Sequence, residues 1–142
     1  MRGNKIAKIK KMKPRVFITA SYQGGRNRGE IEKLCLLVRQ SGFEDFCFIR
    51  DVENYQHIFD DPKELMKRAF DEIQKSDWLL INMTDKPTGR AIEMGIAFAL
   101  NKKIVTIMKR GTIIKDTVRG VSQAIIEYEN IEEIIPKLKE LI

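Results

Sequence analysis

The stretch 76–108, SDWLLINMTDKPTGRAIEMGIAFALNKKIVTIM, decides the fold of this chain. Its apolar run 78–81 is short enough to be a strand that is buried on both faces. After the polar loop 82–89, the segment 90–100 is long and rich in Ala, Met and Leu, which predicts a helix. The β-branched run 104–108 follows. This strand–loop–helix–strand order predicts two parallel strands of one sheet.

Glu93 is the unusual residue of this unit. It is the only charge in 91–100, and the helix is apolar around nearly its whole circumference, which predicts burial. A buried carboxylate is costly unless another group pairs with it or uses it. Glu93 lies one turn after Gly89, at the positive end of the helix and at the carboxyl edge of the sheet, where open α/β sheets bind ligands. We therefore favour a functional role for Glu93 over that of a helix anchor.

The rest of the chain continues the alternation of strands and helices. Further strands are expected at 15–20, 46–49 and 124–128, and further helices at 29–40, 61–75 and after Asn130. Residues 109–120 are expected to form a loop, and Pro136 should kink or divide the last helix. The order predicts an α/β fold with a doubly wound, parallel, five-stranded sheet and helices on both faces.

The composition is that of one soluble globular domain. The chain has 142 residues, of which 43% are hydrophobic and 32% charged, and no apolar run reaches the length of a membrane span. The N-terminus shows no secretory signal, so we expect a cytoplasmic protein. Cys35 and Cys47 have no metal-binding spacing and are expected to be reduced core thiols. No metal or cofactor is expected.

The net charge of +6 is located at the N-terminus. Residues 1–13 hold six cations and no acid, so the remainder, 14–142, is formally neutral. We expect a disordered basic tail followed by a single domain. Such an arm could contact nucleic acid or an acidic surface. The body has no basic stripe with interleaved aromatic residues, so nucleic-acid binding is expected through the tail alone.

Three loops should meet at the carboxyl edge of the sheet. The first, SYQGGRNR, offers hydroxyl groups, glycine backbone amides and a guanidinium, which together suit an anion. An ordinary flexible turn is the alternative for this loop. The candidate binding residues of the three loops are Ser21, Tyr22, Gly24, Gly25 and Arg26, then Thr88 and Gly89, then Arg119. A glutamate in a phosphate-lined crevice can attack the anomeric carbon of a phosphorylated sugar or stabilise its oxocarbenium-like transition state.

Three segments together resemble the nucleoside 2-deoxyribosyltransferase family. They are FITASYQGGR, the central SDW…TGRAIEMGIAFALNKKIV and the late VRG, and the nearest branch is that of the 2′-deoxynucleoside 5′-phosphate N-hydrolases. The resemblance covers about 16–128. It implies a flavodoxin-like, Rossmann-like fold, Glu93 as the nucleophile, and a 5′-phosphate held by the SYQGGR loop. It also implies a homodimer in which the partner closes the site.

The chain departs from the family pattern at three positions. Phe17 stands where the family has a tyrosine, Ala69 where it has an aspartate, and Pro87 where it has a polar residue. The acid that protonates the leaving base must therefore come from elsewhere, and Asp71 or Asp85 are the candidates.

Three hypotheses follow for the function. The first is an N-ribosyl hydrolase or 2-deoxyribosyltransferase that acts on a nucleoside 5′-monophosphate through Glu93. The second is a non-catalytic nucleotide-binding or sensing module, in which Glu93 bonds ribose hydroxyls. The third is an NAD-cleaving domain similar to the TIR group, which also pairs a parallel sheet with a glutamate. Phe17 and Ala69 favour the second hypothesis, whereas the isolated Glu93 favours the first.

Overall fold

The protein is described by a computed structural model, which covers residues 12–85 and 88–142. Most of the expected basic tail, and Pro87, lie outside the described residues. The strands are β1 (Arg15–Ile18), β2 (Glu44–Cys47), β3 (Trp78–Asn82), β4 (Lys103–Lys109) and β5 (Ala124–Tyr128). The helices are α2 (Arg28–Gln40), α3 (Phe48–Asp51), α4 (Pro62–Gln74), α5 (Gly89–Ala99), α6 (Asp116–Val121), the 3-10 turn η1 (Ile131–Glu133) and α7 (Ile134–Lys139).

The five strands form one parallel sheet in the order β2-β1-β3-β4-β5. This confirms the doubly wound, flavodoxin-like fold. The chain reverses its direction of winding between β1 and β3, so the loops that follow these two strands diverge. A crevice at the carboxyl edge between them is the place where this fold binds ligands.

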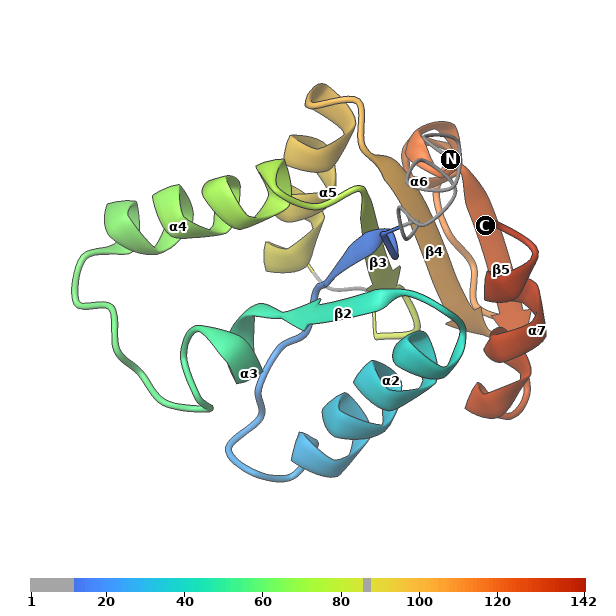
Figure 1. The fold of residues 1–142 in the computed structure, drawn as a ribbon, viewed down its shortest axis with the longest axis horizontal. Helices are drawn as coiled ribbons and strands as arrows, with labels where there is room; N and C mark the ends of the chain where they lie inside the picture. Colours follow the sequence, from blue (N-terminus) through green and yellow to red (C-terminus); the bar gives the residue numbers. More distant parts are fainter. Residues whose placement is uncertain (1–11, 86–87) are drawn as a thin grey trace, which may run out of the picture.

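Two hydrophobic cores lie on the two faces of the sheet. Helices α2 and α7 cover one face, and α4 and α5 cover the other (Figure 1). Residues of β1 alternate between the faces, because Val16 and Ile18 pack under α2 whereas Phe17 packs under α4 and α5. The alternation places Phe17, fully buried, in the same core as Ala69, on the face of the sheet that α4 and α5 cover.

Several expected boundaries were wrong. The second strand is β2 at Glu44–Cys47, because Phe48 and Ile49 already belong to α3. The expected loop 109–120 contains α6. Pro136 does not break α7, because it lies in the first turn, where no intrahelical amide hydrogen is needed.

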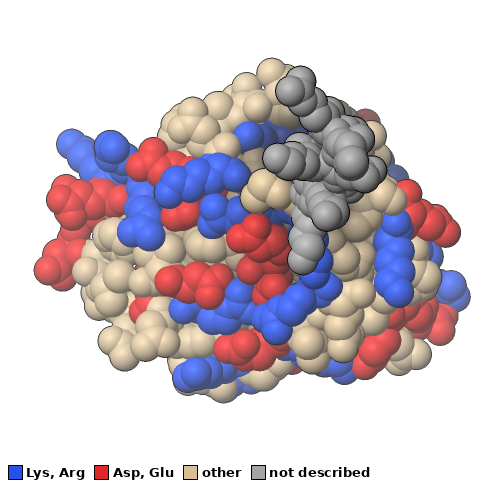
Figure 2. Space-filling view, viewed as in Figure 1, with Lys and Arg blue, Asp and Glu red and all other residues tan. Residues whose placement is uncertain are grey.

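The N-terminal start of α4 is confirmed. Asp61 is the N-cap, and its side chain accepts a hydrogen bond of 2.9 Å from the backbone amide of Lys63. Cys35 and Cys47 are buried free thiols, as expected. Within 12–85 and 88–142, no helix is long and apolar enough to cross a membrane. Lys and Arg alternate with Asp and Glu over the face drawn in Figure 2, without a field of one sign.

Candidate functional site

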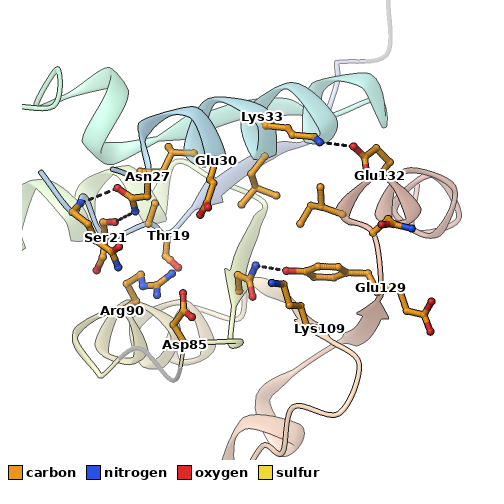
Figure 3. Close-up of a pocket in the computed structure, with 18 residues that line it drawn as sticks. Thr19, Ser21, Asn27, Glu30, Lys33, Asp85, Arg90, Lys109, Glu129 and Glu132 are labelled. Atoms are coloured by element: carbon orange, nitrogen blue, oxygen red, sulfur yellow. Dashed lines mark hydrogen bonds and ion pairs between the residues drawn. The ribbon is translucent and has the colours of Figure 1, made fainter. Parts of the chain in front are cut away.

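A cavity of about 480 Å³ opens at the carboxyl edge of the sheet. The end of β1, the first turns of α2, the end of β3 and the segment after β5 all contribute to its wall (Figure 3). Thr19, Asp85 and Arg90 lie at one end of it, and the ion-paired Lys33 and Glu132 lie at the other. The cavity therefore occupies the crevice that the strand order predicts.

Asn82, the last residue of β3, ties the floor of the cavity together. Its amide nitrogen donates a hydrogen bond of 2.8 Å to the hydroxyl of Tyr128, at the end of β5. Its carbonyl oxygen accepts bonds from the backbone amide and the hydroxyl of Thr84, at 3.0 and 2.6 Å. The hydroxyl of Thr84 in turn accepts from the amide of Lys109, at 3.0 Å. This network fixes the ends of β3, β4 and β5 relative to one another.

Two buried polar atoms on the wall have no partner among the described residues. They are the hydroxyl of Thr19, a residue only 2% exposed, and Nε of Arg90. Native proteins rarely leave such groups unpaired, because each unpaired group costs free energy. A ligand in the cavity with acceptor oxygens would satisfy both.

The first turns of α2 and α5 add backbone donors to the same crevice. Neither N-cap, Asn27 nor Thr88, makes a side-chain capping bond. No capping side chain therefore competes for the first amide hydrogens of each helix, which carry the positive end of the helix dipole, although that of Ala91 in α5 donates to the carbonyl of Thr88 at 3.2 Å. Together with the guanidinium of Arg90, these donors make the crevice suitable for an anionic group.

Glu93 lies next to this wall on α5, three residues after Arg90 and on the same face of the helix. Burial raises the pKa of Glu93 from 4.5 to about 7, with the charge of Arg90 opposing the shift and that of Glu53 adding to it. Burial also lowers the pKa of Arg90, while Asp85 and Glu93 favour its charged form. Glu93 is thus a half-buried carboxyl group whose pKa of about 7 lies near neutral pH.

The structure brings only part of the predicted site together. Asp85 and Ser21 line the cavity, and Glu93 lies beside it. Asp71 does not reach it, because the last turn of α4 leads to the opposite, amino edge of the sheet; there Asp71 pairs with Lys67 at 3.7 Å.

Arg119 is also remote, because α6 runs toward that amino edge. There Gly120 and Val121 share a separate hollow with Lys102 and Lys103. Arg119 therefore does not line the cavity at the carboxyl edge.

The SYQGGR loop turns outward beyond Ser21. Gly24 and Gly25 have positive φ angles of 64° and 92°, which glycine adopts without strain. The guanidinium of Arg26 bonds the carbonyl of Gln23 and does not line the cavity. The ring of Tyr22 packs on that of Tyr55, with 5.3 Å between the ring centroids. Thr88 and Gly89 begin α5 and are exposed.

Sequence reasoning missed Thr19, Arg90 and Tyr128 as wall residues. Arg90 could have been found, since it precedes Glu93 by three positions on the predicted helix. The sequence predicts Thr19 inside the strand 15–20, but Thr19 follows the last residue of β1 and lines the cavity. The role of Tyr128 depends on the position of β5 in the sheet, which no local pattern shows.

The sheet order and the cavity define a flavodoxin-like α/β protein with a ligand site at the topological switch point. No protein-family model matches the sequence, and no functionally curated protein matches it. The structure is similar to that of a CMP N-glycosidase from Clostridium botulinum, with a TM-score of 0.67 and 25% identity, over 90% of this chain and 99% of that chain.

Two further solved structures share the fold. A 2-deoxyribosyltransferase from Bacillus psychrosaccharolyticus has a TM-score of 0.66 and 17% identity, over 87% of this chain and 95% of that one. A conserved protein from Enterococcus faecalis has a TM-score of 0.76 and 12% identity, over 92% of this chain and the whole of that one. The first two names support the resemblance to nucleoside 2-deoxyribosyltransferases and an activity on N-glycosidic bonds.

Proposed function

We propose that this protein cleaves or transfers the N-glycosidic bond of a nucleoside 5′-monophosphate, with Glu93 as the nucleophile at the anomeric carbon. The 5′-phosphate would lie against Arg90, Thr19 and the amides that begin α5. The sugar would then extend toward Glu93. The likeness to a CMP N-glycosidase supports this class of substrate.

The observation that carries the proposal is the position of Glu93. Its carboxyl group is half-buried at the carboxyl edge of the sheet, next to the guanidinium of Arg90, which lines the cavity. Partial burial reduces the hydration of the carboxylate, which favours its action as a nucleophile, and the charge of Arg90 favours the ionised form that the attack requires. A helix anchor would instead be expected to accept hydrogen bonds from the helix amides.

The test is the release of free base from a panel of ribo- and deoxyribonucleoside 5′-monophosphates and NAD, followed by chromatography. Glu93→Gln keeps the shape of the side chain but removes its nucleophilic charge. Base release should vanish, while nucleotide affinity stays within about tenfold, roughly 1.4 kcal/mol. Undiminished release in the variant would exclude Glu93 from the mechanism, and NAD as the only substrate would favour the TIR-like alternative.

A non-catalytic nucleotide-binding module is the second candidate. Phe17 and Ala69, fully and almost fully buried, line the core where the resemblance leads one to expect a tyrosine and an aspartate. In this case the panel would show binding without release of any base, and Glu93→Gln would weaken binding through lost hydrogen bonds to ribose.

A further inference from the structure

The phosphate end of the cavity, at Arg90 and Thr19, is only part of its length. The wall continues past Asn82 to the ion-paired Lys33 and Glu132 (Figure 3). We call this second part, between the first turns of α2 and the segment 128–132, the far arm. One cavity of about 480 Å³ contains both parts, so a ligand that is bound at the phosphate end can extend into the far arm.

Apolar side chains from two elements line the far arm. Ile31 and Leu34 lie one turn apart on α2, and Ile131 comes from η1. The ion pair between Lys33 and Glu132 joins the same two elements at the outer end and keeps them at a fixed separation. A space with such walls suits a flat ring better than a phosphate or a hydrated sugar.

Three polar groups of the far arm have bonding capacity to spare. Tyr128 is only 4% exposed, and its hydroxyl accepts the bond from Asn82, so its own hydrogen can be donated to a ligand. The ammonium group of Lys109 has no bonding partner among the residues that the structure describes. Figure 3 shows Glu30 of α2 on the other side of the cavity, and its carboxylate likewise bonds no residue of 12–85 or 88–142. The far arm therefore presents donors on one side and an acceptor on the other.

The charges of the far arm do not favour an anion. Besides the ion pair that closes the arm, Glu129 is neutralised by Arg110 at 2.5 Å. Among the described residues of the arm, Glu30 and Lys109 are left unpaired, and their charges have opposite signs. A phosphate that bound Lys109 would meet the repulsion of Glu30. A neutral ring that carries both an N–H donor and an acceptor atom satisfies both side chains.

We propose that the far arm is the binding site of the nucleobase, and that Glu30 selects a base with an exocyclic amino group, such as cytosine or adenine. The class of ligand rests on the proposed function. The amino group donates to the carboxylate of Glu30, while a ring nitrogen or carbonyl oxygen accepts from Tyr128 or Lys109. Uracil and hypoxanthine carry a carbonyl oxygen in place of the amino group, and this oxygen would face the carboxylate with no hydrogen between them.

The test compares nucleotides that differ in this group alone: cytidine with uridine 5′-monophosphate, and adenosine with inosine 5′-monophosphate. Calorimetry in a Glu93→Gln background gives their affinities without turnover, and kcat/KM for base release is measured with Glu93 intact. The amino base of each pair should be favoured about tenfold. Glu30→Gln should remove this preference, because the amide can turn either its oxygen or its nitrogen to the ligand. Glu30→Ala should lower the affinity for the amino base to that for the keto base.

Glu64→Gln is the matched control. Glu64 is exposed and is the third residue of α4, as Glu30 is of α2, but it does not line the cavity. This variant should keep the preference of wild type, and thermal melting checks that all three variants fold.

The possible results separate the base-binding site from the proposed reaction. Base release without a preference for amino bases, or with a preference that survives in both Glu30 variants, would overturn the role of Glu30 and leave the proposed function intact. Tighter binding of the amino bases without release of any base would support the base-binding site and contradict the proposed reaction. A protein that neither binds nor cleaves any of the four nucleotides would overturn both.

Discussion

At the scale of the residue, Arg90 replaces Arg26 as the best candidate for reading a phosphate. The guanidinium of Arg26 is exposed and bonded to its own loop, whereas that of Arg90 is half-buried and has an unpaired Nε at the cavity. A charge-assisted hydrogen bond is stronger where water is excluded. The sequence favoured Arg26 because its loop combines glycine amides with a guanidinium and resembles the family segment that holds the 5′-phosphate.

Arg90→Gln should therefore weaken the binding of a nucleotide tenfold to hundredfold, corresponding to ~1.5–3 kcal/mol, and leave that of the nucleoside almost unchanged. Calorimetry in a Glu93→Gln background measures the affinities without turnover. Arg26→Gln is the matched control and should change neither affinity by more than about twofold. Equal losses for nucleotide and nucleoside in the Arg90 variant would show that Arg90 shapes the site without contacting the phosphate.

Glu93 should also leave a signature in stability. Its pKa is raised from 4.5 to about 7 on folding, so the folded state binds the extra proton between these values and the free energy of unfolding falls as pH rises through this window. The Glu93→Gln variant has no carboxyl group at this position, so its free energy of unfolding should not fall in this pH window. At pH 8 the variant should be more stable than wild type by on the order of 2–3 kcal/mol, and at pH 4 the two should differ little. Denaturant unfolding at the two pH values measures this difference, and a variant that is less stable at pH 8 would identify Glu93 as a structural anchor.

At the scale of the element, the sequence predicted the parallel sheet and four of its helices because their periods and breakers are strong. The pattern around residues 44–51 was misleading, since the run FCFI suits a strand or a helix equally well. Short-range side-chain bonds fix the boundary. The carboxylate of Asp51, the last residue of α3, accepts from the amide of the N-cap residue Cys47 at 2.9 Å, while Asp45 in β2 pairs with Arg39 and Arg50. The cavity, in contrast, depends on strand order, which local patterns do not contain.

Glu72 of α4 forms an ion pair with Arg15 of β1, and this contact holds α4 against the sheet at its amino edge. It is 4% exposed and accepts a hydrogen bond of 3.1 Å from Arg15 and one of 3.3 Å from Arg68. Burial opposes its ionisation, but these bonds outweigh burial and hold the pKa of Glu72 below its ordinary value. The stability that the carboxylate contributes is therefore present at neutral pH and lost as pH falls through its lowered pKa.

Glu72→Ala should lower the free energy of unfolding by about 3–5 kcal/mol at pH 7, because it leaves Arg15 half-buried without its carboxylate. Its neighbour Asp71→Asn is the control. Asp71 is more exposed and paired at only 3.7 Å, so that variant should stay within about 0.5 kcal/mol of wild type and release base at the same rate. A loss of base release in Asp71→Asn without a loss of stability would restore Asp71 as the acid.

At the scale of the whole molecule, the outer surface of α4 and α5 exposes several large apolar side chains to solvent. Its exposed large apolar side chains are Met66, Phe70, Ile92 and Phe98. Gly95 and Ala99 are also exposed on α5 and would allow a second helix to approach closely. Large apolar side chains that are exposed on neighbouring helices often mark an interface. Because α5 exposes almost no charge here, a second copy of the same face is a suitable partner, and we propose that the chain forms the homodimer that the family resemblance implies.

Phe98→Glu should convert this dimer to a monomer, because a charge placed at the centre of an apolar interface would have to be buried without a partner. Light scattering coupled to size-exclusion chromatography measures the mass of wild type and variant. Ile113→Glu is the matched control, since Ile113 is 81% exposed in the loop after β4, away from α4 and α5, and this variant should remain dimeric. Ile92 directly precedes Glu93 in α5, so a partner seated over Ile92 would also restrict the approach of water to the nucleophile. Base release should therefore fall in Phe98→Glu and recover as protein concentration rises; a wild type that is monomeric at all concentrations would contradict the dimer and place the full site in one chain.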